Sequence, residues 1–277
     1  MKIKYLLVFL FFITFLTSCS RDENPEIMPE NEPLVTKISA PIFFINVLYY
    51  FGWADYDLHF EYDHLKRLTK QIGGFEEINT SYGTAFSKDV YSSLIYEGNK
   101  VTVEDFSSMP LVFTVPKKTK YFILNEQNKI QQKEIPHTIS SMNKKQVFSY
   151  KNGLIDEVKT TLPNRPYDQT DPNGYVLTYS ERFFYDSNGN LIRTEYYEQH
   201  NGVNMGRKVV RKFENYDNSS NPFKRFTLLD NYFYRSLSKN NFRTFKAEEY
   251  YNGEFVLTLS HQEWVFNYDT KGQIIIN

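Results

Sequence analysis

A short hairpin unit that recurs along the chain constrains its fold more than any other feature. The clearest copy, at residues 185–192, is an aromatic strand end, a turn containing Asn188 and Gly189, and the start of a second strand. Asn and Gly tolerate the positive φ angles that tight hairpin turns require. Longer copies begin at Tyr62, Leu124 and Tyr268, and shorter ones contain Gly98, Gly153 and Gly253. Seven units of this kind predict an all-β chain, with a spacing too irregular for a strict solenoid.

The strand that precedes Asn188 separates apolar from polar side chains at a period of two. One face carries Tyr175, Leu177, Tyr179, Phe183 and Tyr185. The other face carries Thr178, Ser180, Arg182 and Asp186, with Phe184 as an exception. Such alternation is typical of a strand with one buried face. We therefore expect an antiparallel meander of irregular hairpins that forms one large curved sheet or barrel-like body.

Composition supports a β fold and reduces the number of function classes that the chain could belong to. Aromatic residues make up 17% of the chain, about double their average usage, and they favour pleated surfaces and cross-strand pairs. The formal net charge of −1 gives no basis for nucleic-acid binding. The sequence contains no Gly-rich phosphate loop and no His-Glu-x-x-His or Gly-x-Ser-x-Gly motif, so neither catalysis nor a cofactor is expected. Cys19 is the only cysteine, which excludes an internal disulfide framework.

The first 19 residues have the pattern of a bacterial lipoprotein precursor. Lys2 and Lys4 precede an apolar run at 5–16, which predicts an export signal at 1–18. The next segment, Leu-Thr-Ser-Cys at 16–19, resembles a lipobox, in which the cysteine is acylated and becomes the new N-terminus. A short membrane anchor is the alternative, but the run is shorter than the ~20 residues of a spanning helix. We therefore predict a lipid anchor at Cys19, and the loss of both lysines changes the formal charge to −3.

Residues 19–40 are predicted to form a tether between the lipid and a hairpin-repeat domain at 41–277. This segment is rich in proline and acidic residues, a composition that keeps a chain extended. The acidic residues after Cys19 also resemble the surface-export signal of Bacteroidota lipoproteins, and a simple spacer is the alternative. The predicted location is therefore the outer membrane, on the cell surface or on the periplasmic face.

Two stretches at the start of the domain allow more than one interpretation. The hydrophobic stretch 41–53 predicts a strand buried on both faces, with an internal helix as the alternative. In the alternating stretch that follows, His59, Glu61 and Asp63 share one face, and such side chains can bind a metal ion. Ligands in a straight row lie ~6–7 Å apart. A solvated face is therefore the preferred interpretation, and no metal site is predicted.

The predicted binding loop is the turn-rich stretch 160–174, because binding residues usually lie on long loops of a rigid β scaffold. Its candidate residues are Arg165, Tyr167, Asp168 and Asp171. A solvent loop that only joins two hairpins is the alternative. Further loops are predicted at 199–207 and 215–222, and an aromatic strand is predicted at 231–251.

The Tyr-Asp-x-x-Gly-x-Leu/Ile units at 185–191 and 268–274 resemble the YD repeats of RHS-type surface proteins. The chain departs from those repeats in its irregular spacing and in Lys66 and Asn128 at glycine positions. The whole arrangement of lipobox, tether and aromatic hairpins resembles uncharacterised Bacteroidota lipoproteins with a porin-like fold. That resemblance implies a β fold and a cell-envelope location, and it implies no catalytic residues.

Three classes of function follow from these patterns. The leading hypothesis is a lipid-anchored cell-envelope binding or scaffold module, with the membrane and a glycan or envelope protein as partners. Exposed aromatic rings would stack on the ligand, and the alternative is that they only build the core. A glycan hydrolase with paired carboxylates is the second class. A transmembrane β-barrel is the third, and the lipid anchor and the charges scattered through many strands argue against it.

Overall fold

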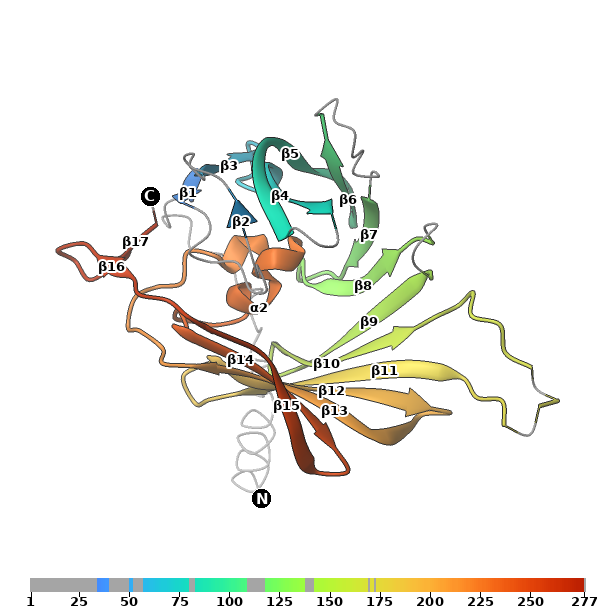
Figure 1. Cartoon of the computed structure of the whole chain (residues 1–277). Helices are drawn as coiled ribbons and strands as arrows, with labels where there is room; N and C mark the ends of the chain where they lie inside the picture. Colours follow the sequence, from blue (N-terminus) through green and yellow to red (C-terminus); the bar gives the residue numbers. More distant parts are fainter. Residues whose placement is uncertain are drawn as a thin grey trace, which may run out of the picture. The chain divides into compact units, whose positions relative to one another are not determined.

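Consecutive hairpins build one large sheet in the computed structural model (Figure 1). The structure describes residues 34–39, 50–51, 57–79, 83–108, 118–137, 142–168, 170–171 and 173–276. The predicted signal at 1–18, Cys19 and most of the stretch 41–53 lie outside these residues.

The sheet has 15 strands, and all but β2 follow one another in chain order as antiparallel neighbours. They are β1 (Lys37–Ser39), β3 (Asp57–Tyr62), β4 (Leu68–Asn79), β5 (Gly83–Glu97), β6 (Lys100–Ser107), β7 (Lys118–Leu124), β8 (Ile130–Ile135), β9 (Lys144–Lys151), β10 (Leu154–Thr161), β11 (Leu177–Tyr185), β12 (Leu191–His200), β13 (Val203–Glu214), β14 (Thr244–Tyr251) and β15 (Glu254–Glu263). β2 (Tyr50–Phe51) pairs in parallel with β5, and β16 (Asn267–Tyr268) pairs with β17 (Ile274–Ile275). The predicted all-β antiparallel meander is confirmed. Among the described strands no pairing joins β1 to β15, so the sheet is curved and open.

Four of the predicted hairpin turns share one hydrogen-bond pattern. The side-chain Oδ1 of the first turn residue accepts hydrogen bonds from the backbone N–H groups two and four positions further on. These first residues are Asp63, Asn125, Asp186 and Asp269. The residue three positions after each has a positive φ: Lys66 (59°), Asn128 (59°), Gly189 (83°) and Gly272 (73°). The Asp or Asn therefore supplies the turn, and glycine is not obligatory at the left-handed position.

Two predictions about local structure are wrong. Residues 199–207 are not a loop, because β12 continues to His200 and β13 begins at Val203, with a turn at Asn201–Gly202. Both turn residues have a positive φ, so this is another two-residue hairpin. The strand residues around this turn are polar because one face of an antiparallel strand can be solvated, so polar composition alone does not indicate a loop.

The predicted strand at 231–251 begins only at Thr244. The residues before it belong to a helical insert (residues 221–243) between β13 and β14. The insert contains η1 (Lys224–Phe226), η2 (Asp230–Tyr232) and α2 (Phe233–Ser236). Its fully buried rings Phe223, Phe226 and Tyr232 recur every three or six residues. This is a helical spacing, whereas the high aromatic content of the segment suggested a strand. No helix in the described part of the chain is long and apolar enough to cross a membrane.

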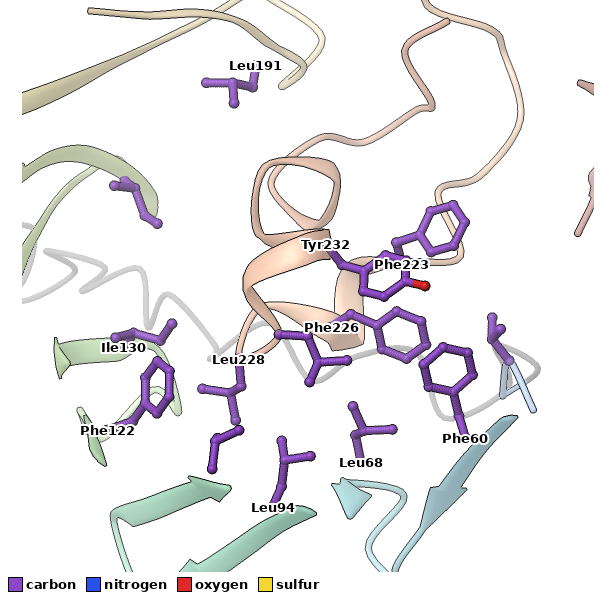
Figure 2. Packing of buried hydrophobic residues seen from close by; sticks show 14 of the residues in the cluster. Phe60, Leu68, Leu94, Phe122, Ile130, Leu191, Phe223, Phe226, Leu228 and Tyr232 are labelled. Carbon is purple, nitrogen blue, oxygen red and sulfur yellow. The ribbon is translucent and has the colours of Figure 1, made fainter. Parts of the chain in front are cut away.

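The hydrophobic core lies between the helical insert and one face of the sheet, called the inner face. Phe226 stacks on Phe60 of β3, with ring centroids 4.5 Å apart. At the other side of the insert, Phe233 makes edge contacts with Phe148 of β9 and Phe183 of β11. Figure 2 shows rings of the insert directed toward side chains of several strands. Strands distant in sequence thus share one core, and the sheet curves around the insert (Figure 1).

Candidate binding site on the inner face of the sheet

A band of polar side chains crosses the inner face beside the core. Each member lies opposite a core residue or another member of the band, or two positions from a core residue along its strand, and therefore faces the same way. For example, Lys133 lies opposite Phe122, and Glu181 is two positions from Phe183. The band, called the polar track, consists of Lys120, Lys133, Gln146, Thr160, Tyr179, Glu181, Tyr196 and Arg211 on strands β7 to β13. Strand pairing places Gln146 opposite both Lys133 and Thr160, and it places Glu181 opposite Tyr196.

Asp230 of the helical insert binds two lysines of the polar track. Its Oδ1 lies 2.5 Å from Nζ of Lys133, and its Oδ2 lies 2.9 Å from Nζ of Lys120. Lys120 also contacts Asp105 of β6 at 2.5 Å. Partial desolvation opposes ionisation of Asp230, but Lys133 and Lys120 outweigh it and hold the pKa of this carboxyl well below its usual range. Burial also opposes the charge of Lys120, yet Asp230 and Asp105 raise the pKa of Lys120 above its usual range.

A second ionic group joins β11, β13 and the helical insert. Nη1 of Arg211 donates to Oε1 of Glu181 at 3.0 Å, and the Tyr234 hydroxyl donates to the same oxygen at 2.9 Å. The Glu181 side chain is only 13% exposed, and the positive charge of Arg211 balances the charge of this carboxylate. Burial is the largest cause that raises the pKa of Tyr234 well above its usual value, followed by the charge of Glu181. The hydroxyl therefore stays protonated and remains a donor.

A pocket of about 200 Å³ separates the two ionic groups. Aromatic rings and polar side chains both line it: Phe122, Ile130, Lys133, Gln146, Phe148, Val158, Glu181, Thr227, Asp230, Phe233 and Tyr234. The Asp230 side chain is 46% exposed, so the pocket is open to solvent although it lies against the core. Its charges are internally balanced, because each carboxylate has a cationic partner.

Two half-buried tyrosines extend the track beyond the pocket. The rings of Tyr179 and Tyr196 stack with centroids 5.4 Å apart, and the guanidinium of Arg211 lies 5.5 Å from the Tyr196 ring centroid. Burial raises the pKa of both tyrosines, so both are neutral at physiological pH. The partly exposed rings and hydroxyls of these tyrosines thus lie next to the charged groups of the track.

Of the four predicted loop residues, only Arg165 joins this surface. Its Nη2 donates to the Tyr175 hydroxyl at 3.3 Å, and Tyr175 in turn stacks on His200 with centroids 3.5 Å apart. Asp168 accepts two hydrogen bonds from Thr170, which lower the pKa of Asp168, and Asp171 accepts one from the backbone of Asn173. These two carboxylates stabilise turns of their own loop. Tyr167 is exposed, and ligand binding by all four residues stays a prediction.

The residues considered for a metal site are used in other ways. Leu58 and Phe60 are buried in β3 while His59 and Glu61 are exposed, as the alternation predicted. Asp63 stabilises its hairpin turn and forms a 2.7 Å salt bridge with Arg67. Within the described ranges, no group of three or more His, Cys, Asp or Glu side chains is arranged to hold a metal ion.

A larger and more open hollow of about 500 Å³ lies near the ends of β10 and β11, with Lys159, Thr161, Thr178 and Gln199 among its lining residues. Its lining includes Tyr179 of the polar track, but it lacks the rings of the helical insert. Small-molecule sites are usually enclosed by apolar and aromatic groups with a few converging polar groups. The inner pocket fits this description better, and we take it with the polar track as the candidate site.

The polar track was missed at the sequence level for a physical reason. Its members come from seven strands, and only the strand register brings them together. One signal was available: Glu181 has the same parity as Tyr179 and Phe183, so a carboxylate interrupts an apolar face. Tyr234 lies within the predicted strand 231–251, and Asp230 lies just before it, so no local pattern marks either residue as part of a site.

No protein-family model matches the chain, and no curated protein matches it. Solved structures that are similar to it include two porin-like proteins from Bacteroides. One is a porin-like protein from Bacteroides uniformis, 10% identical with a TM-score of 0.43, and the match covers 79% of each chain. The other is a porin-like protein from Bacteroides vulgatus, 13% identical with a TM-score of 0.49, and the match covers 88% of this chain and 90% of that one. Each likeness concerns the β fold alone.

Loss of the Asp230 charge is expected to remove an acid-sensitive part of the stability. The pKa of Asp230 is lowered in the folded state. Its contribution to the free energy of unfolding is therefore fully present above the unfolded pKa of ~3.9 and is lost as pH falls below about 4. Asp230→Asn should lower the free energy of unfolding at pH 7 by about 1–2 kcal/mol, a modest value because the side chain is half exposed. Urea denaturation from pH 7 to pH 2 measures both effects.

The matched control is Asp156→Asn, which neutralises an exposed carboxylate of β10. This variant should lose the same unfolding free energy below pH 4 as the wild type does. An Asp230→Asn variant whose stability falls below pH 4 as steeply as that of the wild type would show that Asp230 is not held by the two lysines.

Proposed function

We propose that the chain is a lipid-anchored module of the cell envelope that binds a polar, uncharged ligand on its inner face, with a glycan segment as the ligand class. The observation that carries this proposal is a solvent-open, charge-balanced polar track on the face that elsewhere forms the hydrophobic core. Burying a polar group on a core face costs free energy unless the group has a hydrogen-bonding or ionic partner or binds a ligand. Here they are paired with one another and still border an open pocket.

The chemistry of the track matches that of a sugar. The half-buried rings of Tyr179 and Tyr196 offer apolar contact surface, and the side chains of Gln146, Glu181 and Asp230 offer acceptors or donors for hydroxyl groups. Each carboxylate already has a cation, so a neutral ligand leaves no charge unpaired. A pocket of about 200 Å³ is below the usual size for drug-sized ligands, and it suits one ring of a longer chain.

The envelope location rests on the N-terminal sequence. Lys2, Lys4 and the apolar run precede Cys19 in the order that a lipoprotein signal requires, and the acidic tether follows it. Incorporation of a labelled fatty acid into the wild type, and its absence in Cys19→Ser, would support the anchor. Equal labelling of both chains would refute it.

Binding of neutral oligosaccharides to the purified full-length chain in detergent tests the proposed function. A glycan array selects the strongest ligand, and titration calorimetry then measures its affinity. Tyr196→Ala should weaken binding about 5- to 30-fold, since loss of one aromatic ring from a binding site costs about 1–2 kcal/mol. The control, Tyr121→Ala, removes an exposed ring from the opposite face of the sheet and should leave the affinity unchanged. An array without any bound glycan, or equal losses in both variants, would contradict the proposal.

We propose binding without catalysis. Asp230 and Glu181 line the same pocket, which is the residue pair that a glycan hydrolase would need. A hydrolase acid requires a carboxyl with a raised pKa. The pKa of Asp230 is instead lowered by two lysines, and Glu181 is paired with Arg211.

A further inference from the structure

Exposed apolar side chains gather at the tips of the β12–β13 and β14–β15 hairpins. The two tips are neighbours, because β13 pairs with β14 and Arg207 lies opposite Tyr251 near both turns. The exposed apolar residues of these tips, called the apolar tip, are Val203, Met205, Tyr251, Phe255, Val256 and Leu257. Single exposed apolar residues are ordinary on a protein surface, whereas a contiguous group of them marks an interaction surface.

The apolar tip has side chains on both faces of the sheet. Leu257 lies opposite Glu249 of β14. Phe255 lies opposite Tyr250, the next residue of β14. Successive strand residues point to opposite faces, so the Leu257 and Phe255 side chains do so as well. A protein that docks on a sheet covers one of its faces, whereas lipid surrounds a projecting tip on every side.

The edge of β15 is not suited to another strand. Its pairing with β14 skips Val256 and Leu259, so each of these is the extra residue of a bulge. Bulges twist an edge and interrupt its regular ladder, which disfavours the addition of a strand. The apolar side chains along this edge therefore need a partner that imposes no strand register, and lipid is such a partner.

A cation lies directly behind the apolar tip. Nζ of Lys208 is 5.9 Å from the ring centroid of Tyr197 and 5.5 Å from that of Tyr250. No carboxylate of a described residue forms a salt bridge with Lys208. Its charge is therefore available to a phosphate headgroup. Tyrosine rings, such as those of Tyr250 and Tyr251, favour the boundary between water and lipid.

We propose that the apolar tip contacts the surface of the bilayer that holds the lipid anchor, with Lys208 at its phosphate headgroups. This inference rests on the anchor of the proposed function and adds an orientation to it. The chain from Cys19 to Leu34 can span at most ~50 Å, so an anchored body meets the bilayer at a high effective concentration. The contact uses none of the residues of the polar track.

Fluorescence quenching in vesicles tests the contact. The lipidated full-length chain is reconstituted into vesicles of phosphatidylethanolamine and phosphatidylglycerol, with and without brominated acyl chains. Phe255→Trp and Met205→Trp should each lose emission in the brominated vesicles beyond the loss of the wild type, which has two tryptophans. The control is Leu65→Trp, at a similarly exposed position in the turn between β3 and β4. It should add no loss to that of the wild type.

Sedimentation of the same vesicles reports the anchor separately. The wild type should sediment with the vesicles, and Cys19→Ser should be retained less. If the wild type sediments but neither reporter in the apolar tip is quenched beyond it, the anchor stands and the tip contact is wrong. The same result is expected if the apolar tip binds a protein instead of lipid. Equal quenching of Leu65→Trp would also overturn the contact, and a wild type that does not sediment would overturn both the contact and the anchor.

Discussion

Replacement of Phe226 by alanine is expected to lower the free energy of unfolding by about 3–5 kcal/mol, a typical cost for removing a buried ring. Phe226 is fully buried in the helical insert, where it stacks on Phe60 of β3 and contacts the Tyr232 ring at 5.1 Å. The missing ring would leave a cavity between the insert and the first strands of the sheet (Figure 2). Urea denaturation followed by tryptophan fluorescence and circular dichroism measures the loss.

The control for this prediction is Tyr121→Ala, because Tyr121 is exposed on the opposite face of the sheet. Its cost should stay below about 1 kcal/mol. If Phe226→Ala costs no more than Tyr121→Ala, the helical insert is not the centre of the core.

Glu181→Ala is expected to have the second largest effect, a loss of about 2–4 kcal/mol of unfolding free energy. The change leaves the Arg211 guanidinium and the Tyr234 hydroxyl without their shared acceptor, and breaking a buried ion pair from one side leaves an uncompensated charge. Glu181→Gln keeps an acceptor oxygen of the same size and should cost less. Chemical denaturation of each variant provides the values.

A double-mutant cycle separates the ion pair from general packing. Arg211→Met removes the buried charge, so Glu181→Ala made in an Arg211→Met background should cost much less than it does in the wild type. Equal costs in the two backgrounds would show that Glu181 and Arg211 are not coupled.

The hairpin turns were predictable because their chemistry is local. An Asp or Asn that starts a turn, and a residue that accepts a positive φ three positions later, are adjacent in the sequence. Even the substitutions Lys66 and Asn128 for glycine left the turn recognisable. The alternation around His59 was predictable for the same reason, since it requires only the two-residue period of one strand.

The helical insert was not predictable from the same signals. Its rings pack against β3, β9, β11 and β13, so distant strands rather than local propensity determine that this aromatic segment is not a strand. The strand boundary at Thr244 depends on pairing with β13, which no local pattern specifies.

The candidate site depends even more on distant pairing. Lys120, Lys133 and Asp230 are brought together by the register of two strands and by the position of the insert. The sequence predicted a site at four residues of the loop at 160–174. Of these, only Arg165 approaches the inner face, through its hydrogen bond to Tyr175. A charged residue on an otherwise apolar strand face, such as Glu181, is the most useful signal for sites of this kind.

Hydrogen exchange of the full-length chain, measured by mass spectrometry with and without a bound oligosaccharide, tests the central claim most directly. If the inner face binds the ligand, exchange should slow in β9 to β12 and in the helical insert, the elements that carry the pocket and the two stacked tyrosines. The turns at Gly189 and Gly272 should exchange equally in both states. Slower exchange confined to those turns or to the loop at 160–174, with β9 to β12 unchanged, would contradict an inner-face site.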